Sequence, residues 1–308
     1  MPYLVIGRRI TLTLSEFLKD RNIPFAEREA LSRHTSIRCG GVCRTFVSPK
    51  SQEELIACAD FLSSAKVPWY LVGHMTNTLP PDGESDAVFV STRAMQGIRM
   101  SGDSTAVSAG VCGAAFFRFL LGEGRMAFPA LAGIPGTIGG AVRGNAGAFG
   151  YETADAVLSC EIYSTEKKKK YTVPPEEMRF SYRHSRLCEE EGEILLSATY
   201  RTPLFDRETA KAELCRLTAL RRASQPLGEP SLGSVFLRVG ERSAAYYIDR
   251  LGLKGRRIGG AEVSKKHAGF IVNTGGARSE DVRLLAQAVK AEVERVYGIV
   301  LRSEIYLM

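Results

Sequence analysis

The sequence predicts an α+β protein with an N-terminal α/β region and a C-terminal α+β region. In the N-terminal region, short apolar runs alternate with helical patterns, and a long amphipathic helical pattern lies near the C-terminus. The composition, 44% hydrophobic and 24% charged residues, is typical of a globular chain, and the length of 308 residues suggests two domains or one large domain with an elaboration. No internal repeat or low-complexity linker interrupts these patterns.

Helices and strands alternate in the N-terminal region. Ser51-Gln52-Glu53-Glu54, which follows Pro49, is a capping box that begins a helix continuing to about Ala65. Gly113–Leu121 predicts a second helix. Short apolar segments predict strands, at residues 69–73, 87–91, 105–109, 156–164, 170–173 and 194–201.

The C-terminal region begins with a predicted helix over residues 206–222 and continues with strands. Strands are expected at residues 234–239, 269–273 and 302–307. Ser279 is predicted to cap an amphipathic helix that Gly298 ends. The apolar residues of this helix recur at helical spacing: Val282, Leu285, Val289, Val293 and Val296.

The net charge of +7 is dispersed along the chain. The one dense run, Lys167–Lys170, stands between two strand-like segments, which indicates a solvated hairpin tip rather than a nucleic-acid patch. No apolar run is long enough to span a bilayer, and Met1–Arg9 lacks the long apolar region of a signal peptide. We therefore expect a cytoplasmic protein that binds neither nucleic acid nor membrane.

The seven cysteines are odd in number and scattered, and none forms a Cys-x-x-Cys pair. They are Cys39, Cys43, Cys58, Cys112, Cys160, Cys188 and Cys215. This pattern indicates reduced thiols. Cys39 and Cys43 have no nearby cysteine or histidine set to complete a zinc site, so no metal is expected.

The most informative stretch is Gly133–Ala148, which holds six glycines and one proline and follows the apolar Phe128–Ala132. Glycine lets backbone N–H groups approach an anion closely and permits positive φ. The spacing matches neither the dinucleotide fingerprint nor the P-loop. Glycine content alone supports two interpretations about equally, a backbone wrapped against a ligand or a tight set of turns between packed elements.

The order of the residues favours the first interpretation. Gly133–Ala141 and Gly144–Gly150 closely resemble the flavin-embracing stretch of the UDP-N-acetylenolpyruvoylglucosamine reductases. The resemblance runs from about residue 34 to the C-terminus, and further segments repeat it in the family's order. They are His34–Gly41, Val72–Asn77, Phe180–Ser185, Arg221–Pro226, Pro230–Phe236, Gly252–Gly255, Arg257–Ala261, Val263–Asn273 and Ser303–Ile305.

The resemblance implies a fold and a reaction. It implies an N-terminal extension (1–24), an FAD-binding domain (25–200) and a C-terminal α+β substrate domain (201–308). The FAD domain would have the vanillyl-alcohol-oxidase-like architecture, with the flavin between two subdomains. The family uses NADPH and FAD to convert UDP-N-acetylglucosamine enolpyruvate into UDP-N-acetylmuramate for peptidoglycan. The FAD is expected to be non-covalent, because neither His74 nor Cys112 lies in a recognisable attachment motif, and the protein is expected to be a monomer.

The resemblance also assigns site residues. The catalytic residues would be Ser234 as proton donor, with Arg183 and Glu304 completing the site. The cofactor-binding residues would be Gly73, His74, Thr76, Asn77, Gly133, Ile134, Pro135, Gly136, Thr137, Gly139, Gly140, Asn145, Ala146 and Gly147. The substrate-binding residues would be Tyr182, Arg221, Gln225, Arg238 and His267.

Two segments depart from the family pattern. In the loop after Gly73, Met75 stands where the family has glycine, whereas Thr76 supplies a hydroxyl and Asn77 is retained. Leu237 stands where the family has lysine, followed by Arg238. Because neighbouring strand residues point to opposite faces, Arg238 replaces that lysine only if a bulge shifts the register. The chain lacks the tyrosine-bearing insertion of one subgroup, so we place it in the shorter subgroup.

Three functions are compatible with this pattern. The reductase is favoured, because the complete set of motifs exceeds what any single residue indicates. Taken singly, Ser234, Arg183, Glu304 and His267 are ordinary strand, surface or core residues. A flavoprotein with another substrate is disfavoured by the match over Ser264–Asn273. A non-catalytic UDP-sugar-binding paralogue with weakened FAD binding has the altered loop 73–79 as its only support.

Overall fold

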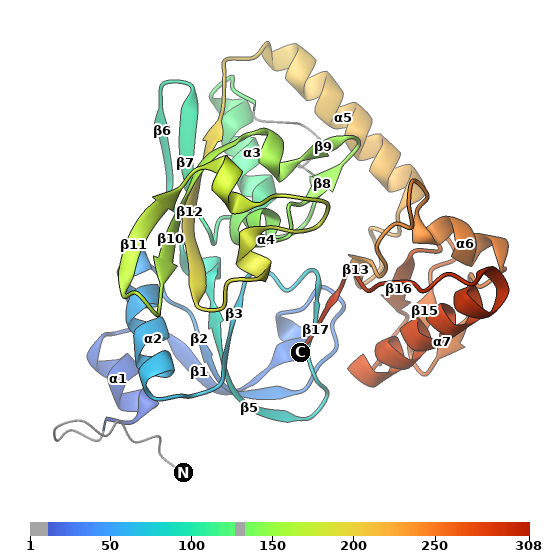
Figure 1. Cartoon of the computed structure of the whole chain (residues 1–308), viewed down its shortest axis with the longest axis horizontal. Helices are drawn as coiled ribbons and strands as arrows, with labels where there is room; N and C mark the ends of the chain where they lie inside the picture. Colours follow the sequence, from blue (N-terminus) through green and yellow to red (C-terminus); the bar gives the residue numbers. More distant parts are fainter. Residues whose placement is uncertain (1–11, 127–132) are drawn as a thin grey trace. The chain divides into compact units, whose positions relative to one another are not determined.

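The computed structural model describes residues 12–126 and 133–308. These residues form two compact units, each built from segments that are separated in the sequence (Figure 1). Unit 1 consists of the described parts of Met1–Glu27, Thr45–Gly73 and Asp86–Thr218. Unit 2 consists of Arg28–Arg44, His74–Ser85 and Ala219–Met308. The predicted apolar segment Phe128–Ala132 lies outside the described residues.

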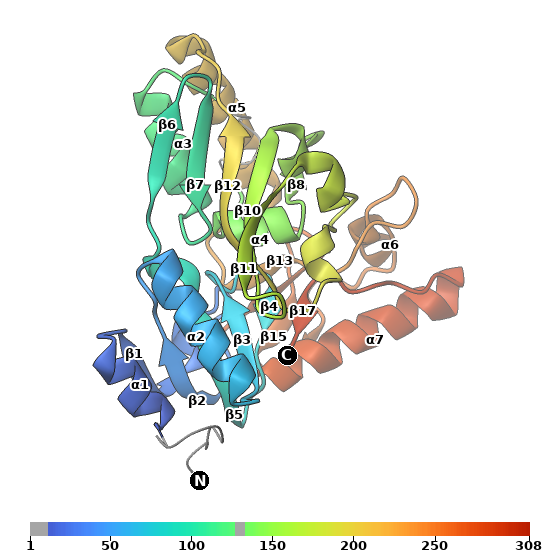
Figure 2. The same ribbon diagram turned by 60° about the vertical axis from the view of Figure 1, so that its left-hand side comes forward.

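A four-stranded sheet forms one part of unit 1, and the unit's boundaries fall within three of its strands. Its order is β1 (Phe25–Ala30), β2 (Val42–Val47), β5 (Glu84–Ser91) and β3 (Trp69–Val72). Helices α1 (Leu14–Asp20) and α2 (Gln52–Ser64) share a buried apolar cluster with β5. Figure 2 shows the ribbon of α2 running alongside this sheet. Ser51 caps α2 by accepting the Glu54 N–H at 3.2 Å, which confirms the predicted start of this helix.

An antiparallel five-stranded sheet forms the other part of unit 1. Its order is β11 (Lys169–Val173), β10 (Val157–Ser164), β12 (Glu193–Arg201), β7 (Ser104–Ser108) and β6 (Ile98–Ser101). Helices α3 (Gly113–Gly122) and α4 (Ile138–Arg143) share one buried cluster with this sheet and cover one of its faces (Figures 1 and 2). The short hairpin of β8 (Gly147–Ala148) and β9 (Tyr151–Glu152) follows α4.

The lysine run lies on the hairpin between β10 and β11, as expected. All four lysines are exposed, as expected, and two of them also contact α2. Lys168 Nζ lies 2.7 Å from the Asp60 carboxylate, and Lys170 Nζ donates to Gln52 at 3.3 Å. Two of the four lysines therefore fasten the hairpin to α2, a contact between distant segments that the local charge pattern does not reveal.

Unit 2 is built on a four-stranded antiparallel sheet. Its order is β13 (Ser231–Ser234), β16 (Phe270–Asn273), β15 (Ala261–Val263) and β14 (Arg257–Ile258). Helices α6 (Ala244–Arg250) and α7 (Ser279–Tyr297) pack on it through one apolar cluster. Helix α5 (Arg207–Ser224) connects β12 to this sheet, and the boundary between the units falls within it.

The amphipathic helix α7 ends at Gly298, whose φ is 66°, as predicted. Its predicted apolar residues are buried except Val296, which is 44% exposed. Its start differs from the prediction, because Ser279 is the first helical residue rather than the cap. The Asp82 carboxylate accepts the N–H groups of Ser279 and Glu280 at 2.7 and 2.8 Å. A side chain far away in sequence thus caps the helix and stabilises its positive end.

The last predicted strand is shorter than expected. Only β17 (Tyr306–Leu307) is regular, and it pairs in parallel with β4 (Thr78–Leu79). The Met308 N–H continues this ladder to the Leu79 carbonyl at 3.1 Å. Among the described residues, no helix is both long enough and apolar enough to cross a membrane.

Candidate functional site

The glycine-rich segment begins in unit 1 as a turn that enters α4. Gly136 has a φ of 137°, and the Thr137 hydroxyl caps the helix by accepting the Gly140 N–H at 3.3 Å. Gly139 packs on backbone, since a Cβ there would lie 3.1 Å from the Ala109 carbonyl oxygen. Gly133, Pro135 and Gly140 are exposed, so close packing does not explain those positions. Close packing therefore explains Gly139, whereas the ligand interpretation stays a prediction for the exposed glycines.

Gly73, directly after β3, meets this turn. A Cβ on Gly73 would lie 2.4 Å from the Thr137 hydroxyl oxygen and 3.0 Å from its methyl carbon. Only glycine allows the end of β3 to approach the start of α4 this closely. The structure thus brings together two predicted cofactor segments that are far apart in the sequence.

The altered loop continues into unit 2, where Met75 keeps a glycine-like backbone. Its φ is 46°, in the left-handed region, and its side chain is 3% exposed. That conformation costs a non-glycine residue about 1–2 kcal/mol. The buried side chain offsets a cost of this size, since full burial of a methionine contributes about 1.5–3 kcal/mol. Position 75 therefore has a left-handed backbone even with a methionine side chain.

Arg183 lies in a tight turn of unit 1. Ser181 and His184 exchange backbone hydrogen bonds of 3.1 and 3.0 Å around Tyr182 and Arg183. Arg183 has a φ of 58° and donates from Nη2 to the Gly147 carbonyl at 3.0 Å. Its guanidinium also lies over the Tyr182 ring, 5.1 Å from the centroid. The arginine is thereby held against the glycine-rich segment.

Ser234 and Glu304 both belong to unit 2 and lie on neighbouring extended segments. Ser234 pairs with Phe270 at a register shift in β13, beside Gly233, whose φ is 77°. The Glu304 N–H donates to the Val235 carbonyl at 2.8 Å. Asn77 fixes the same segment from the other side, since its amide donates to the Glu304 carbonyl at 3.0 Å. The structure thus brings these two predicted catalytic residues near each other, whereas Arg183 belongs to unit 1.

The segment after Ser234 has a regular register. Val235 pairs with Glu304, Phe236 with Ser303 and Leu237 with Arg302. No bulge therefore intervenes over 235–237, and Arg238 does not move to the face that Leu237 occupies. Leu237 is half-buried and Arg238 is exposed. The role of Arg238 in substrate binding stays a prediction.

Arg221 and Gln225 lie at the end of α5. The Arg221 Nε donates to the Gln225 side chain at 3.4 Å. The Arg221 Nη1 is buried and has no hydrogen-bond partner among the described residues. Burial lowers the pKa of this guanidinium. It remains charged at neutral pH because its ordinary pKa is above 12. A buried cationic donor without a partner is costly, so an anionic ligand would be stabilised there.

His267 follows Ser264, whose hydroxyl accepts the His267 backbone N–H at 3.4 Å. Its Nδ1 accepts the Gly269 N–H at 3.2 Å, and its ring contacts Phe270 edge-on at 4.9 Å. Burial lowers the pKa of His267, so the ring is mainly neutral at pH 7. With Nδ1 as acceptor, the proton is on Nε2, which is then a donor for a ligand.

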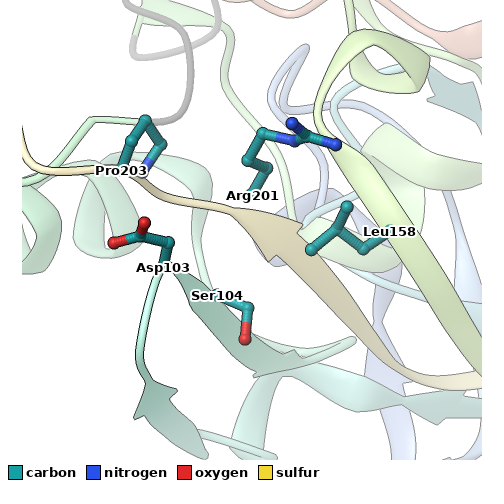
Figure 3. A pocket seen from close by; sticks show the side chains of 5 residues that line it. All are labelled: Asp103, Ser104, Leu158, Arg201 and Pro203. Atoms are coloured by element: carbon teal, nitrogen blue, oxygen red, sulfur yellow. The ribbon is translucent and has the colours of Figure 1, made fainter.

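In the described residues, the pocket, the metal-ligating side chains and the cysteines provide no further candidate site. A pocket of about 360 Å³ in unit 1 is lined by none of the predicted residues. Its lining residues are Asp103, Ser104, Leu158, Arg201 and Pro203, and Figure 3 shows the Asp103 carboxylate and the Arg201 guanidinium pointing away from each other. Within residues 12–126 and 133–308, no three metal-ligating side chains cluster. All seven cysteines are free, and burial raises the pKa of Cys58 and Cys160 to about 12.

Comparison with known proteins defines first the class and then the family. Residues 44–166 match the model of the FAD binding domain, so the chain is a flavoprotein of that class. Residues 225–308 match the C-terminal domain of UDP-N-acetylenolpyruvoylglucosamine reductase. The chain belongs to the UDP-N-acetylenolpyruvoylglucosamine reductase family.

Similar proteins span nearly the whole chain. The reductase of Lactobacillus acidophilus is 36% identical over 293 residues, which is 94% of this chain and 97% of that protein. The reductase of Thermosipho melanesiensis is 35% identical over 90% of this chain and 93% of its own length. The crystal structure of the enzyme from Thermus caldophilus superposes with a TM-score of 0.79 at 26% identity, covering 92% of this chain and 98% of that one. The α+β fold with its FAD-binding domain, and FAD as the cofactor, are thereby confirmed.

Replacing Gly73 by alanine should weaken FAD binding by roughly tenfold to a hundredfold. The new methyl group would press on Thr137 and separate the two loops, and overpacking of this kind costs about 1–3 kcal/mol. Fluorescence titration of the apoprotein with FAD measures the effect. Gly122→Ala is the matched control, because a Cβ there meets no described atom within 4 Å. An unchanged affinity in Gly73→Ala would show that the approach of the loops does not matter for the cofactor.

Proposed function

We propose that the chain catalyses the reduction of UDP-N-acetylglucosamine enolpyruvate to UDP-N-acetylmuramate, with FAD as bound cofactor and NADPH as reductant. The family and the FAD-binding domain support this activity. It supplies a precursor of peptidoglycan. We further propose that the protein works as a monomer in the cytoplasm, with an FAD domain over residues 25–200 and a substrate domain over 201–308.

The residues of unit 1 fit a flavin dinucleotide. Gly73 and Thr137 leave no room for a Cβ between the two loops, and the neighbouring Gly133 and Gly140 are exposed without side chains. A glycine backbone of this kind can approach a diphosphate closely. We assign the cofactor to this segment, held without a covalent bond.

The proposed reaction needs few side chains from the protein. When bound and reduced, the flavin supplies a hydride to the enolpyruvyl CH₂ carbon. Negative charge then spreads over the adjacent carbon and its carboxylate. We assign Arg183 to that charge, because its planar guanidinium matches a carboxylate in a bidentate way. We assign the Ser234 hydroxyl as the donor of the proton to the adjacent carbon, with Glu304 beside it.

We assign substrate binding to five residues: Tyr182, Arg221, Gln225, Arg238 and His267. The best-supported of these is Arg221, whose buried Nη1 has no hydrogen-bond partner among the described residues. The substrate carries a diphosphate and a carboxylate, either of which pairs with a guanidinium. The neutral His267 ring adds an uncharged donor through Nε2.

Replacing Arg221 by alanine should raise the KM for the UDP-sugar roughly tenfold to a hundredfold and change kcat little. A hydrogen bond to a charged group contributes about 1.5–3 kcal/mol, and the Arg221 Nη1 has no partner among the described residues that would compete with the ligand. Its loss should leave the melting temperature unchanged. Steady-state kinetics with NADPH in excess measures the effect. Arg222→Ala, at the exposed neighbouring position, should change neither constant.

A single preparation tests the proposed function. The purified protein should be yellow, and acid precipitation should release the colour into the supernatant. NADPH should be oxidised at a high rate only when the enolpyruvyl UDP-sugar is present. Colour that stays in the pellet would contradict a non-covalent cofactor. A colourless protein that binds the sugar would identify the non-catalytic paralogue, and NADPH oxidation that ignores the sugar would identify another flavoprotein.

A further inference from the structure

The turn that carries Arg183 has an unfavourable backbone. Arg183 is the third of four residues in the turn Ser181–His184, and its φ of 58° is one that glycine or asparagine adopts more readily. Such a conformation persists only where surrounding contacts impose it. The neighbours of the turn therefore decide where the guanidinium lies.

Both ends of this turn are fastened to the same segment, Arg143–Gly147. At one end, the Asn145 amide donates to the Ser181 carbonyl at 3.0 Å. At the other end, the Ser185 hydroxyl donates to the Arg143 carbonyl at 2.8 Å. Both side chains belong to fully buried residues, so water does not compete for these bonds.

Hydrogen bonds hold both ends of the Asn145 side-chain amide. Its second amide hydrogen goes to the Glu152 carboxylate at 2.7 Å, and its Oδ1 accepts the Ala154 N–H at 3.0 Å. Both of its donors are thus used within unit 1. Its side chain has no donor left for a cofactor, which separates it from the glycines around it.

We propose that Asn145 and Ser185 are positioning residues that hold the Arg183 turn on the segment Arg143–Gly147. The segment assigned to the flavin thereby also sets the orientation of the arginine assigned to the substrate. This inference rests on the proposed function for the role of Arg183, and it gives the Asn145 side chain a task other than contact with FAD. Ser185 belongs to the sequence motif Phe180–Ser185, but only the fold reveals its partner.

Asn145→Ala and Ser185→Ala test the inference in the holoenzyme. Each should slow the reoxidation of the reduced flavin by the enolpyruvyl sugar by roughly 10–100-fold, since small misplacements of a catalytic group have effects of this size. Reduction by NADPH should change less than about threefold, because Arg183 takes no part in that half-reaction. In an Arg183→Ala background, either replacement should have almost no further effect. Full additivity would overturn the inference.

Hydrogen exchange supplies a readout that does not depend on turnover. Amide exchange of the peptide covering 181–185 should become at least tenfold faster in both variants, because each removes one anchor of the turn. Tyr163→Phe is the matched control, since it removes a buried-ring hydroxyl bonded to Asp60 elsewhere in unit 1 and should leave this peptide unchanged. Unchanged exchange in Ser185→Ala, the milder variant, would overturn the inference even if the wild-type enzyme performs the proposed reaction.

Discussion

Replacing Ser234 by alanine should slow the oxidative half-reaction with the enolpyruvyl sugar by about 10²–10⁴-fold or more, while flavin reduction by NADPH stays nearly intact. General-acid groups contribute about this much, and the loss is larger when no water can take their place. The reductive half-reaction needs no proton from the protein at that carbon, so it should not respond. The serine lies at a register shift of β13 beside Glu304, a position unlike that of an ordinary strand residue.

Stopped-flow absorbance of the flavin separates the two halves. Ser243→Ala is a suitable control in the same unit, since that serine is exposed and its side chain makes no cap hydrogen bond to α6. It should match the wild type in both halves. Equal slowing of both halves by Ser234→Ala, or no slowing of the second, would mean that Ser234 is structural and that the proton comes from another group.

Replacing Arg183 by alanine should slow the same half-reaction by roughly 10²–10³-fold, because the charge that develops on the enolate loses its main partner. Arg183→Lys should recover part of the rate, since it keeps the charge but loses the planar pair of donors. In the double variant with Ser234→Ala, the losses should not multiply, because both residues act on one transition state.

Arg179→Ala is the matched control for this arginine. Arg179 is a nearby residue of unit 1 that also has a positive φ, of 50°, and it forms ion pairs with Glu189 and Glu190. Exposed pairs of this kind contribute about 0–1 kcal/mol, so both half-reactions should stay at the wild-type rate. If Arg179→Ala slows the oxidative half as much as Arg183→Ala does, the effect reflects the stability of the loop and not the charge at position 183.

The local elements of the fold could be predicted because local rules determine them. The cap at Ser51 and the left-handed Gly298 mark the ends of α2 and α7 through contacts within a few residues. The Asp82 cap of α7 and the pairing of β17 with β4 could not be predicted. Each depends on a partner about 200 or more residues away, whose place no local pattern specifies.

In the candidate site, too, motifs predicted individual residues but not the contacts between distant ones. Motifs identified Gly73, Thr137 and Arg183, but not the contact of Gly73 with Thr137. The sequence placed Asn145 among the cofactor residues, whereas the fold commits both of its donors to Glu152 and Ser181. The left-handed φ of Met75 could not be predicted either, because the residue type does not reveal the φ that its neighbours impose.

The pairing of β4 with β17 also determines when unit 2 can fold. The two strands are separated by about 230 residues, so closing that loop carries a high entropic cost and is slow. At a synthesis rate of about 5–20 residues per second, β4 emerges roughly 10–45 s before its partner. During that interval the segment 74–85 has neither the β17 ladder nor the α7 end that Asp82 caps. We therefore expect unit 2 to complete its fold only after β17 has been synthesised.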